Sequence, residues 1–173
     1  MDPRASTSSE LRHSAEQPAN IQPRTDATPE NHTPEGGIQK QLRCVEQFHR
    51  TFNCGVRTTP TANIGLETAR FRHALMREEN QEYLDAVEAG DVVEVADALG
   101  DQLYVLCGTM IEHGMQGIIE DVFAEIHRSN MTKLGDDGKP VYREDGKVAK
   151  GPNFSRPNLK GIVESKVATE KKE

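Results

Sequence analysis

Apolar residues recur at intervals of three and four positions along four separate stretches of this chain. These stretches are 38–53, 66–89, 91–112 and 118–130. Such spacing places the apolar side chains on one face of an α-helix, which repeats every 3.6 residues. The pattern therefore predicts an all-α fold, and the short links between the helices favour an antiparallel four-helix bundle.

The link between the second and third predicted helices is the best marked. Gly90 suits the position just past a helix end, because glycine adopts a positive φ without a steric cost. Asp91 suits the N-cap of the next helix, and Glu94 three positions later completes a capping-box pattern. We therefore expect helices 66–89 and 91–112 to form a tight antiparallel pair.

The predicted helix 91–112 is apolar on nearly all of its faces. A helix of this kind is usually buried between other helices. A small bundle that contains such a helix is therefore expected to form at least a dimer.

The segments outside these helices are polar. Residues 1–38 are rich in Pro, Ser, Thr, Asn and Glu and cannot bury enough surface to offset their ordering entropy, so we expect a disordered tail. One folded domain is expected over 39–163, followed by a flexible tail over 164–173. The Asp-Gly pairs at 137–138 and 145–146 predict a short polar hairpin or loop after the bundle.

Charge and composition narrow the class of protein. The net charge of −7 argues against a nucleic-acid binder, because such binding depends on cations that neutralise phosphates. No stretch has 18 consecutive apolar residues, so no membrane span is expected. The three cysteines are an odd number and make a poor disulfide framework. A reducing cytoplasm fits best.

Carboxylates cluster on the two helices of the expected pair. Glu79 and Glu82 lie three positions apart on one face, with Glu78 about 100° further around the helix. The third helix carries Glu94, Asp97 and Asp101 at positions i, i+3 and i+7.

These carboxylates interrupt a helix that otherwise has the composition of a protein core. Charged side chains are rarely buried without a partner, and this helix offers no cations of its own. Two acidic faces that meet would require a cation between them, and oxygen ligands suit Mg²⁺ or Mn²⁺. The alternative is an ordinary solvated helix face.

The same residues resemble the all-α nucleoside-triphosphate (NTP) pyrophosphohydrolase superfamily. Its signature is EExxE followed by ExxD, which residues 78–82 and 94–97 match. The segments 97–105 and 127–133 are similar to its MazG-like branch, related to phosphoribosyl-ATP pyrophosphohydrolase. The similarity extends over 45–163.

One position departs from the pattern of the relatives. They often place a Glu three residues before the aspartate that corresponds to Asp101, and here that position is Ala98. Asp97 or Glu94 would have to replace this ligand, and the sequence leaves both open.

The resemblance implies an enzyme with a four-helix bundle of the all-α NTP pyrophosphohydrolase type. Such enzymes hydrolyse a nucleoside triphosphate between the α- and β-phosphates, giving a monophosphate and pyrophosphate. They use Mg²⁺, and Mn²⁺ is a possible substitute. A homodimer or homotetramer is the expected assembly.

This resemblance assigns expected roles to individual residues. Glu78 is the candidate to orient or deprotonate the attacking water. The candidate metal ligands are Glu79, Glu82, Asp97, Asp101 and Glu94. The candidate substrate-binding residues are Arg128, Asn130, Lys133, Lys147, Lys150 and Tyr104.

The cations among them suit the β- and γ-phosphates, although each is also a common surface residue. Tyr104, with Phe48 and Phe52, is a candidate to flank the base, although aromatic residues at helical spacing are also common in helix cores.

Two other functions remain open at this stage. One is phosphoribosyl-ATP pyrophosphohydrolase itself, acting in histidine synthesis. The other is a non-catalytic helical module that binds nucleotide or metal. The completeness of the acidic set favours an enzyme.

Overall fold

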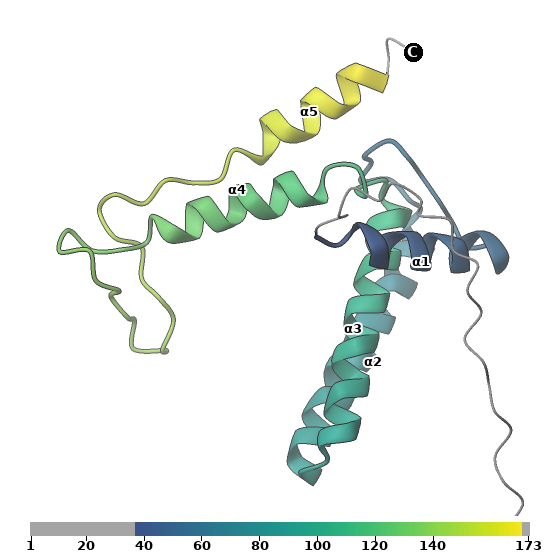
Figure 1. Ribbon diagram of the computed structural model, residues 1–173, viewed down its shortest axis with the longest axis horizontal. Helices are drawn as coiled ribbons and strands as arrows, with labels where there is room; N and C mark the ends of the chain where they lie inside the picture. Colours follow the sequence, from purple (N-terminus) through teal and green to yellow (C-terminus); the bar gives the residue numbers. More distant parts are fainter. Residues whose placement is uncertain (1–36, 171–173) are drawn as a thin grey trace, which may run out of the picture. The chain divides into compact units, whose positions relative to one another are not determined.

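The computed structural model describes residues 37–170, and its regular elements are helices (Figure 1). They are α1 (Gln39–Thr51), α2 (Leu66–Ala89), α3 (Val92–Glu112), α4 (Ile119–Met131) and α5 (Leu159–Glu170). The all-α class predicted from the sequence is confirmed. Within these residues no helix has the length and apolar character that crossing a membrane requires. Nearly all of the tail predicted over 1–38 lies outside the described residues.

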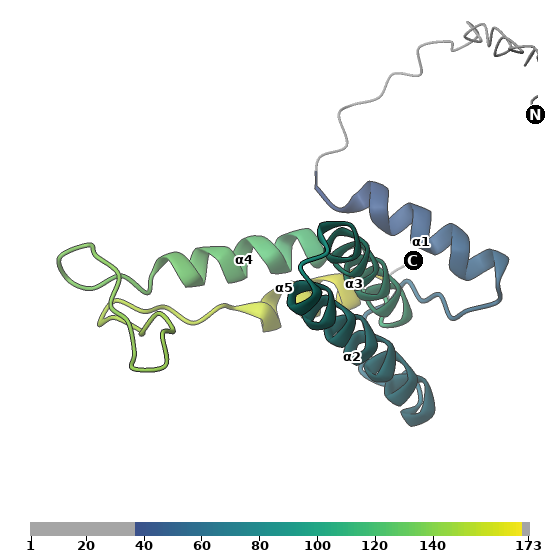
Figure 2. The same cartoon turned by 90° about the horizontal axis from the view of Figure 1, so that it is seen from below.

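Helices α2 and α3 form the antiparallel pair that the sequence predicts, and they lie side by side in both views (Figures 1 and 2). Gly90 adopts a left-handed conformation with φ of 70°. The Asp91 side chain caps α3 by accepting hydrogen bonds from the backbone N–H groups of Val93 and Glu94. Glycine and aspartate therefore reverse the chain within two residues.

The buried core lies between α1 and the C-terminal half of α3. Leu42 and Val45 of α1 pack against Cys107 and Ile111 of α3, and each of the four is at most 2% exposed. The loop between α1 and α2 is tied to the same region, because the backbone N–H of Arg57 donates to Ile111 O at 3.1 Å. One end of α3 is thus enclosed within the chain.

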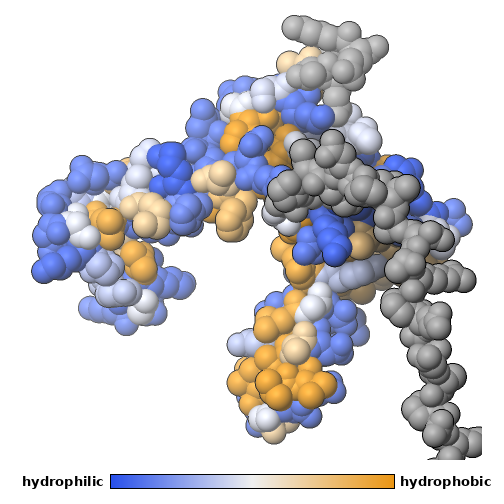
Figure 3. Space-filling view, viewed as in Figure 1, coloured by the Kyte–Doolittle hydropathy of each residue, from blue (hydrophilic) through white to orange (hydrophobic). Residues whose placement is uncertain are grey.

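The other end of α3 is open, which corrects the expectation of a helix buried on nearly all faces. Val92 is 77% exposed, because no helix of the described chain covers the N-terminal half of α3 opposite α2. We name eight of the exposed apolar side chains of this pair the apolar stripe: Tyr83, Leu84, Val87, Val92, Val93, Leu99, Leu103 and Leu106. Figure 3 shows apolar surface gathered at the end of the α2–α3 pair.

Helix α4 packs mainly against α5, a helix that the sequence pattern did not predict. All four predicted helices are therefore present, but within the described chain α1, α2 and α3 pack together while α4 pairs with α5. Helix α5 also continues across the boundary at 163 where a flexible tail was expected. Between α4 and α5, Tyr142 and Val148 form an antiparallel bridge around Gly146, which confirms the predicted turn there.

Candidate functional site

Glu79 lies at the centre of the acidic cluster on α2 and α3. Its Oε2 atom is buried and has no hydrogen-bond partner among the described residues. Burial raises the pKa of Glu79 above its ordinary value of 4.5, and repulsion from Glu82, Asp101, Glu78 and Asp97 raises it further, in that order. The fold therefore brings together five of the six carboxylates singled out in the sequence.

Glu94 is the carboxylate that lies apart from this cluster. It is in the first turn of α3, seven residues before Asp101 and therefore about 10 Å away along the helix axis. It is not among the charges that raise the pKa of Glu79, whereas Asp97 is. Of the two ligands that the sequence left open, Asp97 is the better placed.

No described cation forms an ion pair with the cluster. Glu78, Glu82, Asp97 and Asp101 are exposed and Glu79 is half-buried. None of the ion pairs between described residues includes any of these five. Among the described residues, the negative charges therefore face one another without an ion-pair partner.

The chemistry of these donors fits a hard divalent cation. Carboxylate oxygens are the ligands that Mg²⁺ and Mn²⁺ prefer, and a buried carboxylate oxygen without a partner requires a proton or a cation. In residues 37–170, however, no three His, Cys, Asp or Glu side chains already enclose an ion. The carboxylates would therefore have to rotate toward a bound ion.

A second set of charged side chains, which the sequence did not reveal, is buried at the other end of α3. Glu112 is 6% exposed and accepts hydrogen bonds from Arg57 Nη1 at 2.8 Å and from the Gly55 backbone at 3.1 Å. His49 and Arg72 are also buried; Arg72 interacts with the charge of Glu112, and His49 Nδ1 lies 2.8 Å from the carbonyl of Gly55. Apolar periodicity cannot identify such residues, because it treats every polar position as exposed.

The predicted phosphate-binding cations fall into two groups. Arg128 binds Glu125 through Nε at 2.8 Å and Nη2 at 2.9 Å, and it also donates to the carbonyl of Arg156. It therefore joins α4 to the segment before α5. By contrast, Lys133, Lys147 and Lys150 line a cavity of about 760 Å³ in the hairpin.

The remaining predicted substrate-binding residues lie on α4 and α3. Asn130 is exposed near the end of α4. Tyr104 is 41% exposed, and its ring meets that of Phe48 edge-on with 5.7 Å between the ring centroids. Tyr104, one turn of α3 after Asp101, also lines a cavity of about 300 Å³. Gly100 of α3 and Cys44 of α1 line the same cavity.

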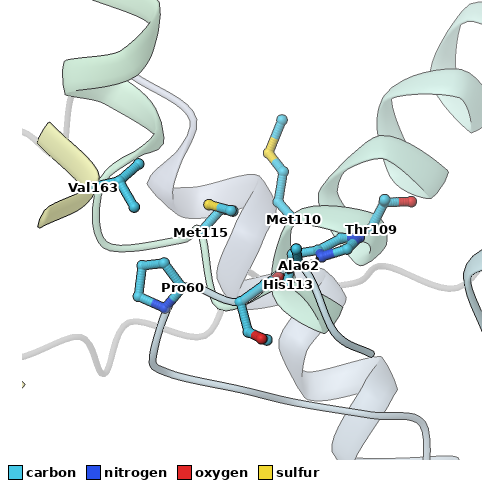
Figure 4. Close-up of a pocket in the computed structure, with 8 residues that line it drawn as sticks. Pro60, Ala62, Thr109, Met110, His113, Met115 and Val163 are labelled. Carbon is cyan, nitrogen blue, oxygen red and sulfur yellow. Dashed lines mark hydrogen bonds between the residues drawn. The ribbon is translucent and has the colours of Figure 1, made fainter. Parts of the chain in front are cut away.

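A further cavity of about 480 Å³ lies at the C-terminal end of α3 (Figure 4). Pro60, Met110, Met115 and Val163 give it a mainly apolar wall. His113 points into the same region and contacts Thr61 O through Nδ1 at 2.7 Å. No carboxylate of the acidic cluster lines this cavity, so it lies apart from the candidate chemistry.

The comparison with protein families concerns the helices that carry the acidic cluster. The model of the family "phosphoribosyl-ATP pyrophosphohydrolase" matches residues 45–130. This range contains α2, α3 and every carboxylate of the cluster, and it ends before the basic hairpin. The resemblance predicted from the sequence is thereby confirmed, and it supports pyrophosphohydrolase activity in general.

The solved structures that match include a crystal structure from Exiguobacterium sp. 255-15, described there as a candidate NTP pyrophosphohydrolase. It is 28% identical, with a TM-score of 0.39, and the match covers 76% of this chain and 96% of that one. A search of curated proteins finds no match.

Proposed function

From the phosphoribosyl-ATP pyrophosphohydrolase family domain carried by residues 45–130, we propose that this chain hydrolyses a (deoxy)nucleoside triphosphate between its α- and β-phosphates. The products are a monophosphate and pyrophosphate, and the reaction depends on Mg²⁺ or Mn²⁺. The proposal is carried by the buried Oε2 of Glu79, which has no partner and lies among four other carboxylates. Housekeeping of the cytoplasmic nucleotide pool is the expected role.

Glu79, Glu82, Asp97 and Asp101 are the proposed metal ligands. When bound, Mg²⁺ supplies positive charge at the α-phosphate and makes water easier to deprotonate. The four side chains belong to α2 and α3, which pack side by side, and each would have to rotate toward a bound ion. Repulsion between these carboxylates disfavours the metal-free state. A bound divalent cation relieves that repulsion, which raises its affinity for the site.

Glu78 is the proposed residue that orients or deprotonates the attacking water. It is exposed and adjacent in sequence to Glu79, so its carboxylate is near the ligands without being enclosed by them. A general base needs this combination of proximity and freedom from the metal. Glu94 remains an outer carboxylate that could attract the cation without binding it.

The phosphates of the substrate are proposed to meet cations from the hairpin. Lys133, Lys147 and Lys150 surround one cavity, and a lysine acts on phosphate as a point charge. Arg128 and Asn130, nearby on α4, are secondary candidates. Since Arg128 already binds Glu125, its main contribution would be to hold the segment before α5 through Ser155 and Arg156.

The base is proposed to lie against the aromatic side chains between α1 and α3. Tyr104 and Phe48 form an edge-on pair, and the ring centroids of Phe48 and Phe52 are 4.4 Å apart. These rings are partly exposed, which leaves surface for stacking. Gly100 keeps the adjacent cavity open because it adds no side chain.

A second copy of the chain is the proposed cover for the apolar stripe. Soluble monomers rarely expose large contiguous apolar patches, and the stripe runs along both α2 and α3. A homodimer or homotetramer would bury it and complete the helical bundle. No nucleic-acid or membrane partner is proposed.

One alternative is supported by the printed description of the family itself, namely phosphoribosyl-ATP as the substrate. The bond cleaved and the metal site would be the same. The substrates would differ only in the nucleoside part that is attached to the α-phosphate. A non-catalytic nucleotide- or metal-binding module is the remaining alternative. It would bind Mg²⁺ without releasing pyrophosphate.

The test is pyrophosphate release from a panel of nucleoside triphosphates and phosphoribosyl-ATP with Mg²⁺, with products resolved. The Glu79→Ala plus Glu82→Ala variant should lose at least about 10³-fold in turnover, because the metal stabilises the transition state by several kcal/mol. The matched control, Glu67→Ala plus Glu88→Ala, removes two charges from the same helix outside the cluster. Undiminished turnover in a folded Glu79/Glu82 variant would remove the assignment.

A further inference from the structure

A buried arginine joins α2 to α3 away from the acidic cluster. Arg72 of α2 is 8% exposed, and its Nε donates to Thr109 Oγ1 at 3.1 Å while its Nη2 donates to the carbonyl of Val105. The Thr109 hydroxyl donates in turn to the same carbonyl at 2.9 Å. One side chain of α2 therefore contacts two successive turns of α3.

The surface of α3 is shaped to receive this guanidinium. A Cβ atom on Gly108 would lie 2.6 Å from Arg72 Nη2 and 2.7 Å from His49 Nε2, so only glycine permits both side chains to lie there. Burial lowers the pKa of Arg72, and the negative charge of Glu112 opposes this effect. Arginine nevertheless keeps its charge in proteins, so its burial is matched by these directed hydrogen bonds.

The acidic cluster needs a fixed axial register between the two helices. A shift of one residue moves a side chain by about 1.5 Å and turns it by about 100°, which would aim a carboxylate away from the others. Apolar contacts along the pair are not directional, and repulsion within the cluster pushes the helices apart. A second directed bond lies at the cluster itself, where Gln102 Nε2 donates to the Glu79 carbonyl at 3.2 Å.

We propose that Arg72 is a positioning residue: with Gln102, it fixes the register of α2 on α3 and so holds Glu79 opposite Asp101 for a divalent cation. The inference rests on the proposed function in that the cluster must bind such a cation. Arg72 itself touches neither the metal nor the substrate. Its effect is therefore on metal affinity, and it should disappear when metal is saturating.

The experiment measures Mn²⁺ binding to the full chain without nucleotide, by the electron paramagnetic resonance signal of free Mn²⁺. Arg72→Lys keeps the charge but loses the two-pronged contact, and its Kd should rise about tenfold, as is typical when residues supporting metal ligands are changed. Thr109→Val removes one hydroxyl at nearly constant volume and should raise the Kd a few-fold. At saturating Mn²⁺, both variants should regain wild-type turnover.

The matched control is Leu42→Val, which weakens the core between α1 and α3 without touching the α2–α3 contact. It should lower the melting temperature and leave the Kd within twofold of wild type. If Leu42→Val raises the Kd as much as Arg72→Lys at an equal loss of melting temperature, the effect is general destabilisation and the inference is wrong. If Arg72→Lys does not fold, the Kd of Thr109→Val decides alone.

The outcomes separate this inference from the proposed function. A wild-type chain that binds no Mn²⁺ would refute the metal site, and with it both proposals. A wild-type chain that binds Mn²⁺, with folded Arg72→Lys and Thr109→Val variants that bind it equally well, would overturn the role of Arg72 alone.

Discussion

The two ends of α3 carry carboxylates in opposite situations. Near the C-terminal end, Glu112 is buried and receives hydrogen bonds from Arg57 and from the Gly55 backbone. In the N-terminal half, the negative charges of Asp97 and Asp101 raise the pKa of Glu79, and no ion pair within residues 37–170 neutralises them. Where the chain supplies the counter-charge, the carboxylate is structural. Where it supplies none, a ligand from outside is expected.

The apolar side chains of α3 divide in the same way. Around Ile111 they are enclosed by α1, whereas Leu99 and Leu103 remain 49% and 41% exposed. One end of the helix is therefore completed within the chain. In the part of the chain that the structure describes, the other end has neither an ion-pair partner nor an apolar cover, which is why we propose that a metal ion and a second copy meet there.

The largest effect that would test this contrast is expected from Glu112→Gln. Removing one partner of a buried ion pair costs 3–5 kcal/mol in enclosed sites, but Arg57 is 37% exposed, so we expect a loss of about 2 kcal/mol in the free energy of unfolding. Urea denaturation of the metal-free protein measures this loss. The Kd for Mn²⁺ should rise less than in Arg72→Lys, because Arg72 keeps its hydrogen bonds to Thr109 and Val105; an equal rise would mean that the metal site depends on the charge of Glu112.

The helix pair and the spacing of its carboxylates could be predicted from the sequence, because both depend on interactions between residues close together in the chain. The reversal at Gly90 and Asp91 depends on backbone preferences of those two residues, and the carboxylate spacing depends only on helix geometry. Helix boundaries and the shared acidic face were therefore predictable. Whether Asp97 or Glu94 acts on the charge of Glu79 depends on the position of α2, which spacing along one helix does not contain.

The features that were missed depend on long-range contacts. Arg72 and Glu112 are ordinary polar positions in the sequence, and only the packing of α1 and the loop against α3 encloses them. Helix α5 was missed because its apolar positions, such as Val163, are interspersed with Lys and Glu in a segment resembling a polar tail. The exposure of Leu99 was missed because composition does not say whether a cover comes from the same chain.

A smaller effect is expected from the pH dependence of Glu79→Gln. The pKa of Glu79 is raised in the fold, so its protonated form stabilises the folded state below the ordinary value of 4.5. This contribution is lost as the pH rises through the higher, folded value. The metal-free wild type should therefore lose stability over that window relative to Glu79→Gln, and above it the variant should melt at the higher temperature.

Thermal melting with a chelator present, at a series of pH values, measures this difference. Mn²⁺ affinity of the wild type should rise over the same window, because the proton and the metal compete for one carboxylate. Parallel melting curves for wild type and variant at every pH would show that Glu79 is not under the repulsion described above. Glu88→Gln, an exposed position on the same helix, is the control for loss of one negative charge.

The smallest effect is expected at Glu125, where the carboxylate is partly buried but its counter-charge, Arg128, is 47% exposed. The Glu125 side chain is only 19% exposed, and the hydrogen bond from Arg128, followed by the one from the Asn158 backbone, lowers its pKa to about 2. Its contribution to stability is therefore present above 4.5 and is lost as the pH falls through about 2. At neutral pH, Glu125→Gln should weaken the link between α4 and the start of α5, because the amide accepts from Arg128 without the charge.

Hydrogen exchange of the backbone amides measures this link locally. The Asn158 amide, which donates to Glu125 Oε1 at 2.7 Å, should exchange faster in the variant, while amides around Ile111 should keep their wild-type protection. Exposed ion pairs contribute little because solvent competes for both partners, so global stability should barely change. If Glu125→Gln instead destabilised the chain as much as Glu112→Gln, the contribution of a carboxylate to the free energy of unfolding would depend only on whether it is paired. The contrast between the two ends of α3 would then owe nothing to burial.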